Sequence, residues 1–467
     1  MPILRDTASR VVATRGVLLA CAAAVVGIAS ARAPGYAIAA MSCFVLLTFA
    51  VCARRGWPIL ALGLLAAVAI AVTQATEGNI PSAWKLAGHA VLIPGLFFLL
   101  YYSGELPHRL RLGAYLGLGF MILGAVAGLL GGSGGLSDAA GAIWQEARWI
   151  GAIGVGYAIA RNLGPSTRRW VFVWLLALNA ASLLVSIYQL GGGYTHTRFG
   201  IPEVAGIFGH PTQTSVAGVV LLLFAITERR LLGNRQLLAA AAVGVVDLIV
   251  SVRLKSLIGV GAGLALLCAV SVGMRPRPLA LAGAALPVAV TFALVAFSPS
   301  AGSYNPAATT GLATVYGHAA TRTALFKGAQ RLASVHFPVG AGLATFGSYL
   351  DERREFNTFG QVGLVGSYGF RRGETFLSDN YVAHILAERG YAGLLAWLLS
   401  VGAFLWCALI VPRRIGLLPA VLIAAAIAMS PVLPVFRDGT DIILFFVPVG
   451  MYLWGVTEWF QGRATPS

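Results

Sequence analysis

The stretch Leu377–Phe404, LSDNYVAHILAERGYAGLLAWLLSVGAF, starts with polar and ionisable residues and ends as a long apolar run without charge. Such a run predicts a membrane-crossing helix, because about 20 apolar residues span the hydrocarbon core of a bilayer. Asp379 and Asn380 are typical N-cap residues, whose side-chain oxygens accept from free backbone N–H groups at a helix start. With His384 they place ionisable chemistry at the mouth of this span.

The composition extends this interpretation to the whole chain. Of 467 residues, 58% are hydrophobic and 11% are charged, whereas soluble domains carry about 25% charged residues. We therefore expect an all-α polytopic membrane protein and exclude a soluble α/β domain. The net charge of +16 is not gathered into a basic stripe with aromatics, so no nucleic-acid partner is expected. The five cysteines lie in apolar runs and predict neither disulfides nor a metal site.

About fourteen segments, with a range of about 12–14, are apolar and long enough to be transmembrane helices. They are approximately 15–31, 34–53, 57–74, 83–102, 111–131, 141–161, 169–189, 211–227, 235–252, 254–274, 278–298, 382–411, 414–432 and 438–460.

Lysine and arginine alternate between the predicted loops, which sets the orientation because cytoplasmic loops are the basic ones. The basic loops contain Arg54–Arg55, Arg109 and Arg111, Arg161, Arg168 and Arg169, Arg229, Arg230 and Arg235, Arg275 and Arg277, and Arg413–Arg414. Both termini are then cytoplasmic. The ordinary short loops of the opposite face hold only Arg32, Lys85, Arg148 and Arg437.

Three segments of the predicted outer face, 191–211, 251–256 and 299–378, depart from this rule because they carry many cations. The chain divides into residues 1–298, with eleven spans and the outer loops 191–211 and 251–256, an extracytoplasmic loop 299–378, and residues 379–467 with the last three spans. A loop as long as 299–378 is usually functional. The outer cations include Arg198, Arg253, Lys255, Arg322 and Arg331.

These cations predict an anion site at the outer face. The planar fork of arginine matches phosphate oxygens, so a diphosphate on a lipid is the expected ligand. The alternative is that the same side chains reach to the phosphates of ordinary phospholipids. Membrane lipids are expected partners in either case.

Several groups could act as a general base or as structural residues. Asp379, Glu374, His384 and His336 are the catalytic candidates, since a carboxylate or imidazole near an arginine cluster can take a proton. His210, at the start of a span, is a candidate for binding, and so is Asn380. Histidine pairs and clustered carboxylates with metal-ligand spacing are missing from the sequence, so we expect no metal and no cofactor.

Three stretches together resemble the O-antigen ligase and O-antigen polymerase superfamily of bacterial polysaccharide assembly. They are RFGIPEVAGIFGHPTQTSVAG (Arg198–Gly218), SVRLKSLIGVGAGL (Ser251–Leu264), and HFPVGAGLATFGSYL (His336–Leu350) followed by SDNYVAHILAERGYAGLLAWL (Ser378–Leu398). The third is the most specific, with Glu388, Gly390 and Gly393 in register. The spacings Arg198 to Gly209 and Arg331 to Gly342 also match an Arg-x10-Gly pattern of the polymerases.

The resemblance implies a GT-C-like helical fold in the bacterial inner membrane with its active site facing the periplasm. It implies metal-independent transfer of a glycan from an undecaprenyl-diphosphate-linked oligosaccharide, with Arg198 and Arg253 on the diphosphate. Ligases of this superfamily have a histidine where this chain has Asp379, which favours a polymerase of O-antigen or exopolysaccharide. Ligation of the glycan to lipid A core or to protein remains an alternative. A flippase and a chain-length regulator are possible protein partners.

A function of another class also stays open. A flippase or transporter of lipid-linked oligosaccharides would place ionisable residues deep in the membrane on broken helices. Asp247 is the one candidate of this kind in the predicted spans. A structural membrane subunit is a third possibility.

Overall fold

The computed structural model of the protein describes residues 95–96, 99–100, 102–130, 136–163, 167–191, 197–198, 201–202, 204–208, 210–251, 253, 255–271, 312–347, 352–365, 370 and 380–462. Its helices are α5 (His108–Leu130), α6 (Leu136–Leu163), α7 (Thr167–Gly191), α8 (Pro211–Thr227), α9 (Asn234–Val250), α10 (Ser256–Ser271), α12 (Leu312–Val335), α13 (Glu352–Gln361), α14 (Tyr381–Ile410), α15 (Arg413–Met429) and α16 (Gly439–Phe460). Short 3-10 helices are η1 (Tyr102–Glu105) and η3 (Gly206–Phe208), and the two-residue strands β1 (Thr197–Arg198) and β2 (Ile201–Pro202) pair antiparallel.

The described part of the chain is thus helical apart from one small β pair, as predicted. Helices α5, α7, α14 and α16 are long and apolar enough to cross a membrane, and they coincide with four predicted spans. Helices α8 and α10 are apolar but shorter. The predicted spans 15–31, 34–53, 57–74 and 278–298, and most of 83–102, lie outside the described residues.

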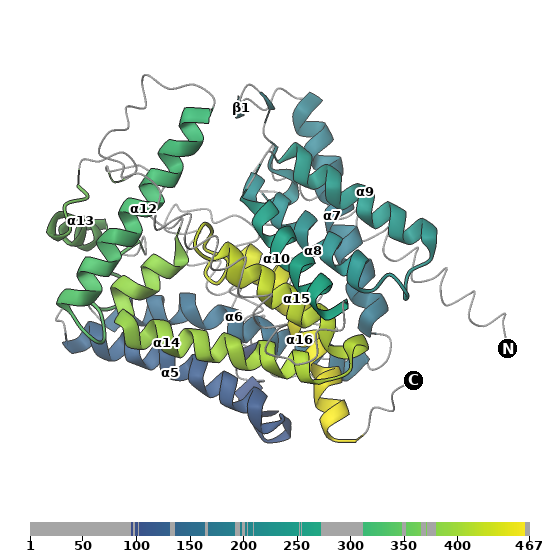
Figure 1. The fold of residues 1–467 in the computed structure, drawn as a ribbon, viewed down its shortest axis with the longest axis horizontal. Coiled ribbons are helices and arrows are strands. Elements are labelled where there is room, and N and C mark those ends of the chain that lie inside the picture. The colour runs from purple at the N-terminus through teal and green to yellow at the C-terminus, as the bar shows by residue number, and fades with distance from the viewer. Residues whose placement is uncertain are drawn as a thin grey trace.

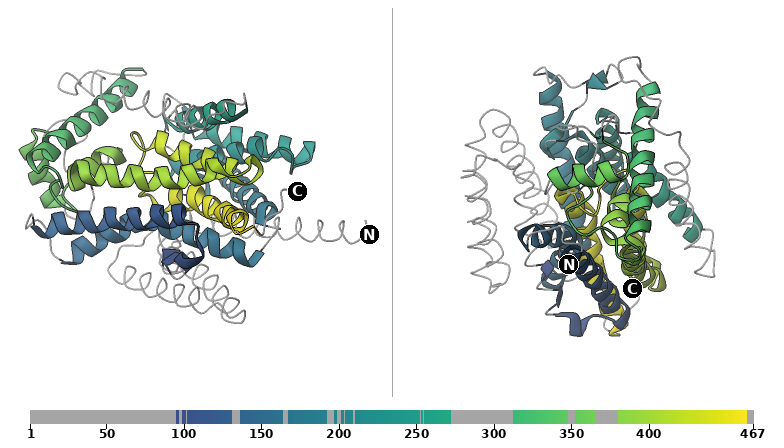
Figure 2. Two further views of the ribbon diagram at one scale, coloured as in Figure 1. Left: turned by 60° about the horizontal axis from the view of Figure 1, so that its bottom comes forward. Right: turned by 90° about the vertical axis from the view of Figure 1, so that its left-hand side faces the viewer.

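The helices pack in pairs that are distant in sequence. Helix α14 runs beside α5, α6 packs on α16, α10 packs on α15, and α8 packs on α9 (Figure 1). The two further views keep α5 and α14 side by side and show α12 reaching beyond the main bundle (Figure 2). The C-terminal helices α15 and α16 therefore form the centre of the described bundle, between the earlier helices.

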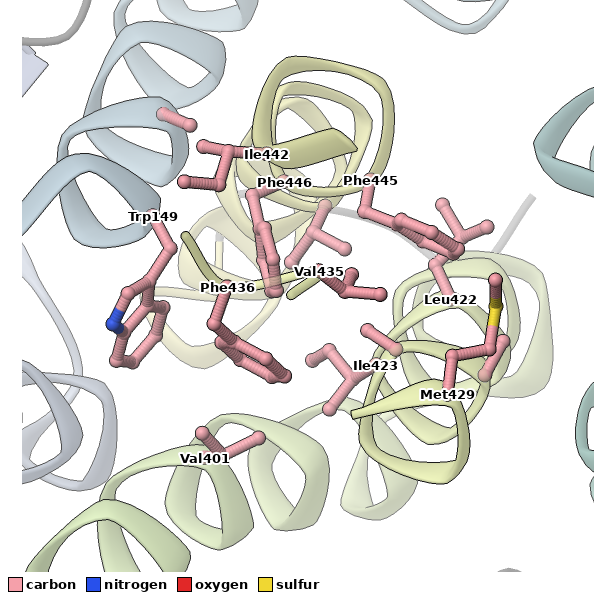
Figure 3. Close-up of a cluster of buried hydrophobic side chains, with 14 of the residues drawn as sticks. Trp149, Val401, Leu422, Ile423, Met429, Val435, Phe436, Ile442, Phe445 and Phe446 are labelled. Atoms are coloured by element: carbon pink, nitrogen blue, oxygen red, sulfur yellow. The ribbon is translucent and has the colours of Figure 1, made fainter. Parts of the chain in front are cut away.

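A cluster of aromatic residues forms the core where α6, α14, α15 and α16 meet (Figure 3). The ring of Phe436, in the turn after α15, lies 5.6 Å from Trp149 of α6, 5.1 Å from Trp397 of α14 and 4.9 Å from Phe446 of α16. Aromatic side chains bury about 150–250 Å² each and pack edge-on or tilted. Phe436 therefore joins the end of the α15–α16 turn to three helices.

The predicted outer loop 299–378 contains two helices, α12 and α13. The buried hydrophobic residues of α12 recur with helical spacing and pack the helix against α14. They are Leu325, Phe326, Ala329, Leu332 and Ala333. This pattern of i, i+1, i+4, i+7 and i+8 describes one apolar face. The rest of the predicted loop lies outside the described residues, except for residues 336–347, 362–365 and 370.

Helix α14 is broken at Gly390, so the predicted span 382–411 consists of two helical pieces joined by a kink. Gly390 has φ 63° and ψ −165°, a backbone conformation that only glycine adopts readily. A Cβ atom at this position would collide with the carbonyl oxygen of Pro338. The close approach of the turn after α12 to this kink therefore depends on glycine.

Candidate functional site

The starts of four helices, α8, α10, α14 and α16, are linked around the turn that follows α15. Asp438 caps α16, accepting from Thr440 N at 2.9 Å, and receives both hydrogen bonds of the Gln213 amide at 3.0 and 3.1 Å. Ser215 of α8 is hydrogen-bonded to Ser256 at the start of α10. The positive ends of these helix dipoles therefore lie near one end of the bundle.

Helix α14 joins the same group through its first residue and its cap. Tyr381 N donates to Ser430 O at 3.0 Å, and the Tyr381 ring stacks on Phe436 at 5.4 Å. The side chain of Asn380 accepts from Ala383 N at 2.9 Å, so the predicted N-cap is Asn380. His210 has the same role in α8, since its Nδ1 accepts from Thr212 N at 3.2 Å. Both residues therefore have a structural function at helix starts.

A buried network of ionisable groups lies beside these helix starts, with Glu146 of α6 at its centre. One Glu146 oxygen lies 3.1 Å from His384 Nε2, and the other accepts from the Tyr381 hydroxyl at 2.5 Å. Arg389 Nη1 is 3.5 Å from the same second oxygen. A buried carboxylate is stable only when paired and hydrogen-bonded, and α14 supplies all three of these partners.

Glu388 ties a loop to this network. Its Oε1 accepts from the backbone N–H groups of Thr345 and Phe346 at 2.9 and 3.0 Å, and its Oε2 is 3.5 Å from His384 Nε2. The backbone adds further bonds, from Ala341 N to Ala387 O and from Gly342 N to Glu388 O. The loop Gly340–Gly347 is therefore held against the first piece of α14.

Both ring nitrogens of His384 face oxygen acceptors. Nδ1 lies 2.7 Å from Phe346 O, and Nε2 faces the carboxylates of Glu146 and Glu388. A carbonyl oxygen can only accept, so Nδ1 donates in this contact. Each ring nitrogen thus has an oxygen partner, and the imidazole links the loop Gly340–Gly347 to α6.

Arg389 is fully buried and has few polar contacts. Its guanidinium lies over the Phe120 ring at 4.4 Å and beside Glu146, but none of its nitrogens makes a hydrogen bond with the described residues. A Cβ atom at Gly124 would lie 2.6 Å from Arg389 Nε, so α5 approaches the guanidinium closely. The network therefore sits between α5, α6 and α14.

Two arginines connect this network to the turn after α15. The Arg437 guanidinium donates to Gln145 Oε1 at 2.8 and 3.0 Å and to Gly347 O at 2.5 Å. Arg148 Nη2 donates to Arg437 O at 2.6 Å. All three guanidinium nitrogens of Arg437 take part in these contacts, so its side chain bridges α6 and the loop Gly340–Gly347.

The other predicted outer residues are distributed around this site. Arg253 and Lys255 are half-buried in the α9–α10 corner. Arg198 pairs with Ile201 through the backbone. Its side chain, like Glu374 and Asp379, lies outside the described residues.

The predicted residues of α12 lie farther along the long outer segment. Arg322 is half-buried, and Arg331 is exposed and donates to Val362 O at 3.4 Å. His336 is exposed in the turn after α12, where its carbonyl oxygen accepts from Gly340 N at 2.9 Å. These contacts of Arg331 and His336 are with Val362 and Gly340, outside the buried network.

Sequence reasoning missed Glu146, Arg148 and Arg437 as members of the site. Arg148 and Arg437 were nevertheless visible as two of the few basic residues assigned to short loops of the predicted outer face. Glu146 lies in the predicted span 141–161, where an ionisable residue suggests function by default. Two different signals, basic residues on the unexpected face and a carboxylate within a span, could thus have identified these residues.

Comparisons with protein-family models, with curated proteins and with solved structures find no match for this chain. Within the described residues, no group of three or more His, Cys, Asp or Glu side chains could hold a metal ion. Any functional assignment therefore depends on the residues themselves.

Proposed function

We propose that this chain is a membrane glycosyltransferase that takes a glycan from an undecaprenyl-diphosphate-linked oligosaccharide at the outer face of the bacterial inner membrane. Its reaction is polymerisation of O-antigen or exopolysaccharide repeat units, and it needs no metal or cofactor. The fourteen-helix, GT-C-like architecture and the orientation with cytoplasmic termini belong to the same proposal.

One observation carries the proposal. The three stretches that resemble the O-antigen ligase and polymerase superfamily are distant in sequence but meet around the turn after α15. Gln213 of the first contacts Asp438, Ser256 of the second contacts Ser215, and Gly347 of the third accepts from Arg437. A shared site explains why residues of all three patterns come to one end of the bundle.

The chemistry of this end suits a diphosphate leaving group. Helix starts attract anions, and the cations Arg253 and Lys255 lie at the start of α10. Preorganised donors of this kind stabilise the negative charge that grows on a departing diphosphate. Arg198 completes the clamp in the proposal, as the resemblance implies.

The acceptor hydroxyl needs a base, for which Asp379 remains the proposed residue. It directly precedes Asn380, the N-cap of α14. The geometry gives His384 a positioning role, because both of its nitrogens already face acceptors. Glu374 and His336 are the remaining candidates for the base.

The test is product analysis with the purified protein and a synthetic undecaprenyl-diphosphate oligosaccharide. Lengthened lipid-linked chains support a polymerase, whereas transfer to added lipid A core or protein supports the ligase alternative. Absence of both products would contradict the proposal.

The arginine clamp is tested with Arg253→Lys, which keeps the charge but removes the bidentate fork, so turnover should fall sharply. Arg229→Lys, in the predicted cytoplasmic loop, is the matched control and should not change turnover.

A second candidate function, translocation of a lipid-linked oligosaccharide, is favoured by Asp247. This carboxylate is fully buried in α9, close to Gly218 of α8, and neither oxygen accepts a hydrogen bond within the described residues. Buried carboxylates in membrane helices often carry protons. Asp247→Asn should abolish movement of a fluorescent lipid-linked sugar across liposomes if this function is the true one, and should leave glycan transfer intact if it is not.

A further inference from the structure

The end of α12 and the turn after it expose large apolar side chains. We define the α12 tip as residues Val335–Pro338; Val335 is 77% exposed and Phe337 is 71% exposed. Apolar surface of this size is unfavourable in water, since folding and binding normally remove it. The position of the tip indicates what covers it.

The α12 tip is fixed against the outer end of the second piece of α14. The ring of Phe337 lies 6.2 Å from the ring of Tyr391, and the N–H of Ala392 donates to Pro338 O at 3.1 Å. These contacts place the tip immediately after the Gly390 kink. The tip is therefore a positioned part of the fold.

The apolar surface of the tip continues along α14. Tyr391, Leu395 and Leu398 recur at i, i+4 and i+7 and are 41%, 57% and 45% exposed, so they form one open face. Helix α14 is long and apolar enough to cross a membrane, and an exposed apolar face on such a helix is the surface expected to contact lipid. Tyrosine, as at Tyr391, is typical of the level where headgroups meet acyl chains. Phenylalanine, as at Phe337, is typical of the apolar side of segments that lie in this interface.

Basic residues of α12 lie on the same side as the tip. Lys327, Arg331 and Val335 follow one another at intervals of four and are all exposed, so they share one face of the helix. Long basic side chains next to apolar residues can reach anionic phospholipid headgroups while their stems contact hydrocarbon. Charge and apolar surface are thus ordered as they are at a membrane surface.

We infer that the α12 tip inserts into the boundary between headgroups and acyl chains of the outer leaflet, with Lys327 and Arg331 on phospholipid headgroups. The occupant of this surface is the phospholipid bilayer, and the tip anchors the long outer segment to it. This inference rests on the orientation proposed above but not on the proposed chemistry, and its failure would leave glycan transfer untouched.

The test uses nitroxide spin labels on the full chain, with its five cysteines replaced by alanine, in nanodiscs of phosphatidylethanolamine and phosphatidylglycerol. Labels are placed at Val335→Cys and Phe337→Cys. Leu395→Cys is the lipid-facing control, and Asn357→Cys, exposed on α13, is the control outside the membrane-spanning helices. Power saturation compares collisions with oxygen, which enriches in lipid, and with a water-soluble nickel chelate.

We expect an oxygen-to-nickel ratio at both tip positions that matches Leu395→Cys and exceeds that of Asn357→Cys several-fold. A ratio like that of Asn357→Cys would overturn the inference, because the tip would then lie in water. Low access to both reagents would overturn it as well, since it would indicate burial against a protein. Lys327→Gln with Arg331→Gln should lower the ratio at Val335→Cys, and an unchanged ratio would remove the headgroup contacts from the inference.

Discussion

Glu146 shows how strongly single residues can be constrained in this bundle. Its two oxygens face His384, Tyr381 and Arg389, three side chains from successive turns of α14. Arg389 in particular needs this carboxylate, because a guanidinium buried without a counter-charge is costly. Residue-scale changes here should therefore affect stability before they affect chemistry.

Glu146→Gln should lower the free energy of unfolding by about 3–5 kcal/mol, because it leaves the buried charge of Arg389 without its partner. Glu105→Gln is the matched control. Its carboxylate also pairs with an arginine, Arg161 at 3.2 Å, but both side chains are partly exposed, so the change should cost less than about 1 kcal/mol. Unfolding in detergent, followed by tryptophan fluorescence, measures both. Equal losses of unfolding free energy in the two variants would show that the buried Glu146–Arg389 pair contributes no more stability than the exposed pair.

His384→Ala separates a positioning role from a base. Because the imidazole binds Phe346 O and Glu146, its loss should cost about 1–3 kcal/mol of stability and loosen the loop Gly340–Gly347. Activity should then fall together with the unfolding midpoint. Full loss of turnover at an unchanged midpoint would instead make His384 the base. His336→Ala, at an exposed position, is the control for stability.

Asp379→Asn tests the proposed base without disturbing the start of α14. The N-cap of α14 is the side chain of Asn380, so the substitution leaves the cap in place. Loss of a general base should reduce turnover by about 10²–10⁴-fold. Normal glycan chain lengths in the variant, at equal expression, would move the search for the base to Glu374 or His336.

At the scale of elements, the kink in α14 determines how the outer segment meets the bundle. The first piece of the helix holds the ionisable network, and the second piece presents Tyr391 and Leu395 on an open face. Gly390 lies between them with a positive φ, and the turn after α12 passes directly over it. One glycine therefore separates the buried network from the open apolar face of α14.

Gly390→Ala should destabilise the protein by at least about 1–3 kcal/mol, because a Cβ is strained in this conformation and meets Pro338 O. Gly402→Ala in the same helix has no atom within 4 Å of the new methyl group and should be neutral or stabilising by up to about 1 kcal/mol. Thermal unfolding of the two variants provides the comparison. A tolerated Gly390→Ala would mean that the kink is dispensable.

At the scale of the whole molecule, the alternation of basic loops predicts which end of the bundle faces outward. On this prediction, the end that gathers the starts of α8, α10, α14 and α16 is expected to be the outer one, and the loop after α8 with Arg229 and Arg230 is expected to be cytoplasmic. This orientation can be measured directly on described positions.

A membrane-impermeant thiol reagent on intact cells should label Asn357→Cys, on α13, and should label Gly233→Cys, before α9, only after the membrane is permeabilised. Both positions are exposed in the structure, so access depends on the side of the membrane. The reverse pattern would invert the topology and place the proposed site in the cytoplasm.

Local pattern alone determined the class of fold and the places of several helices. Apolar length predicted α5, α7, α14 and α16, since the bilayer requires about 20 apolar residues whatever the helix packs against. Cap chemistry predicted the start of α14, because a cap depends on residues three apart. The apolar face of α12 could also have been found from its helical period, within a segment that was predicted only as a loop.

Only the tertiary structure decided which ionisable residues act together. Glu146 and Tyr381 are 235 positions apart, and Arg148 and Arg437 are 289 apart, so no spacing rule connects them. Their meeting follows from how α6 packs on α16 and how α14 packs on α5, which depends on the shapes of side chains such as Trp149 and Phe436. Hydropathy records that a helix is buried in a membrane, whereas the partner of each buried charge is chosen by packing over the whole bundle.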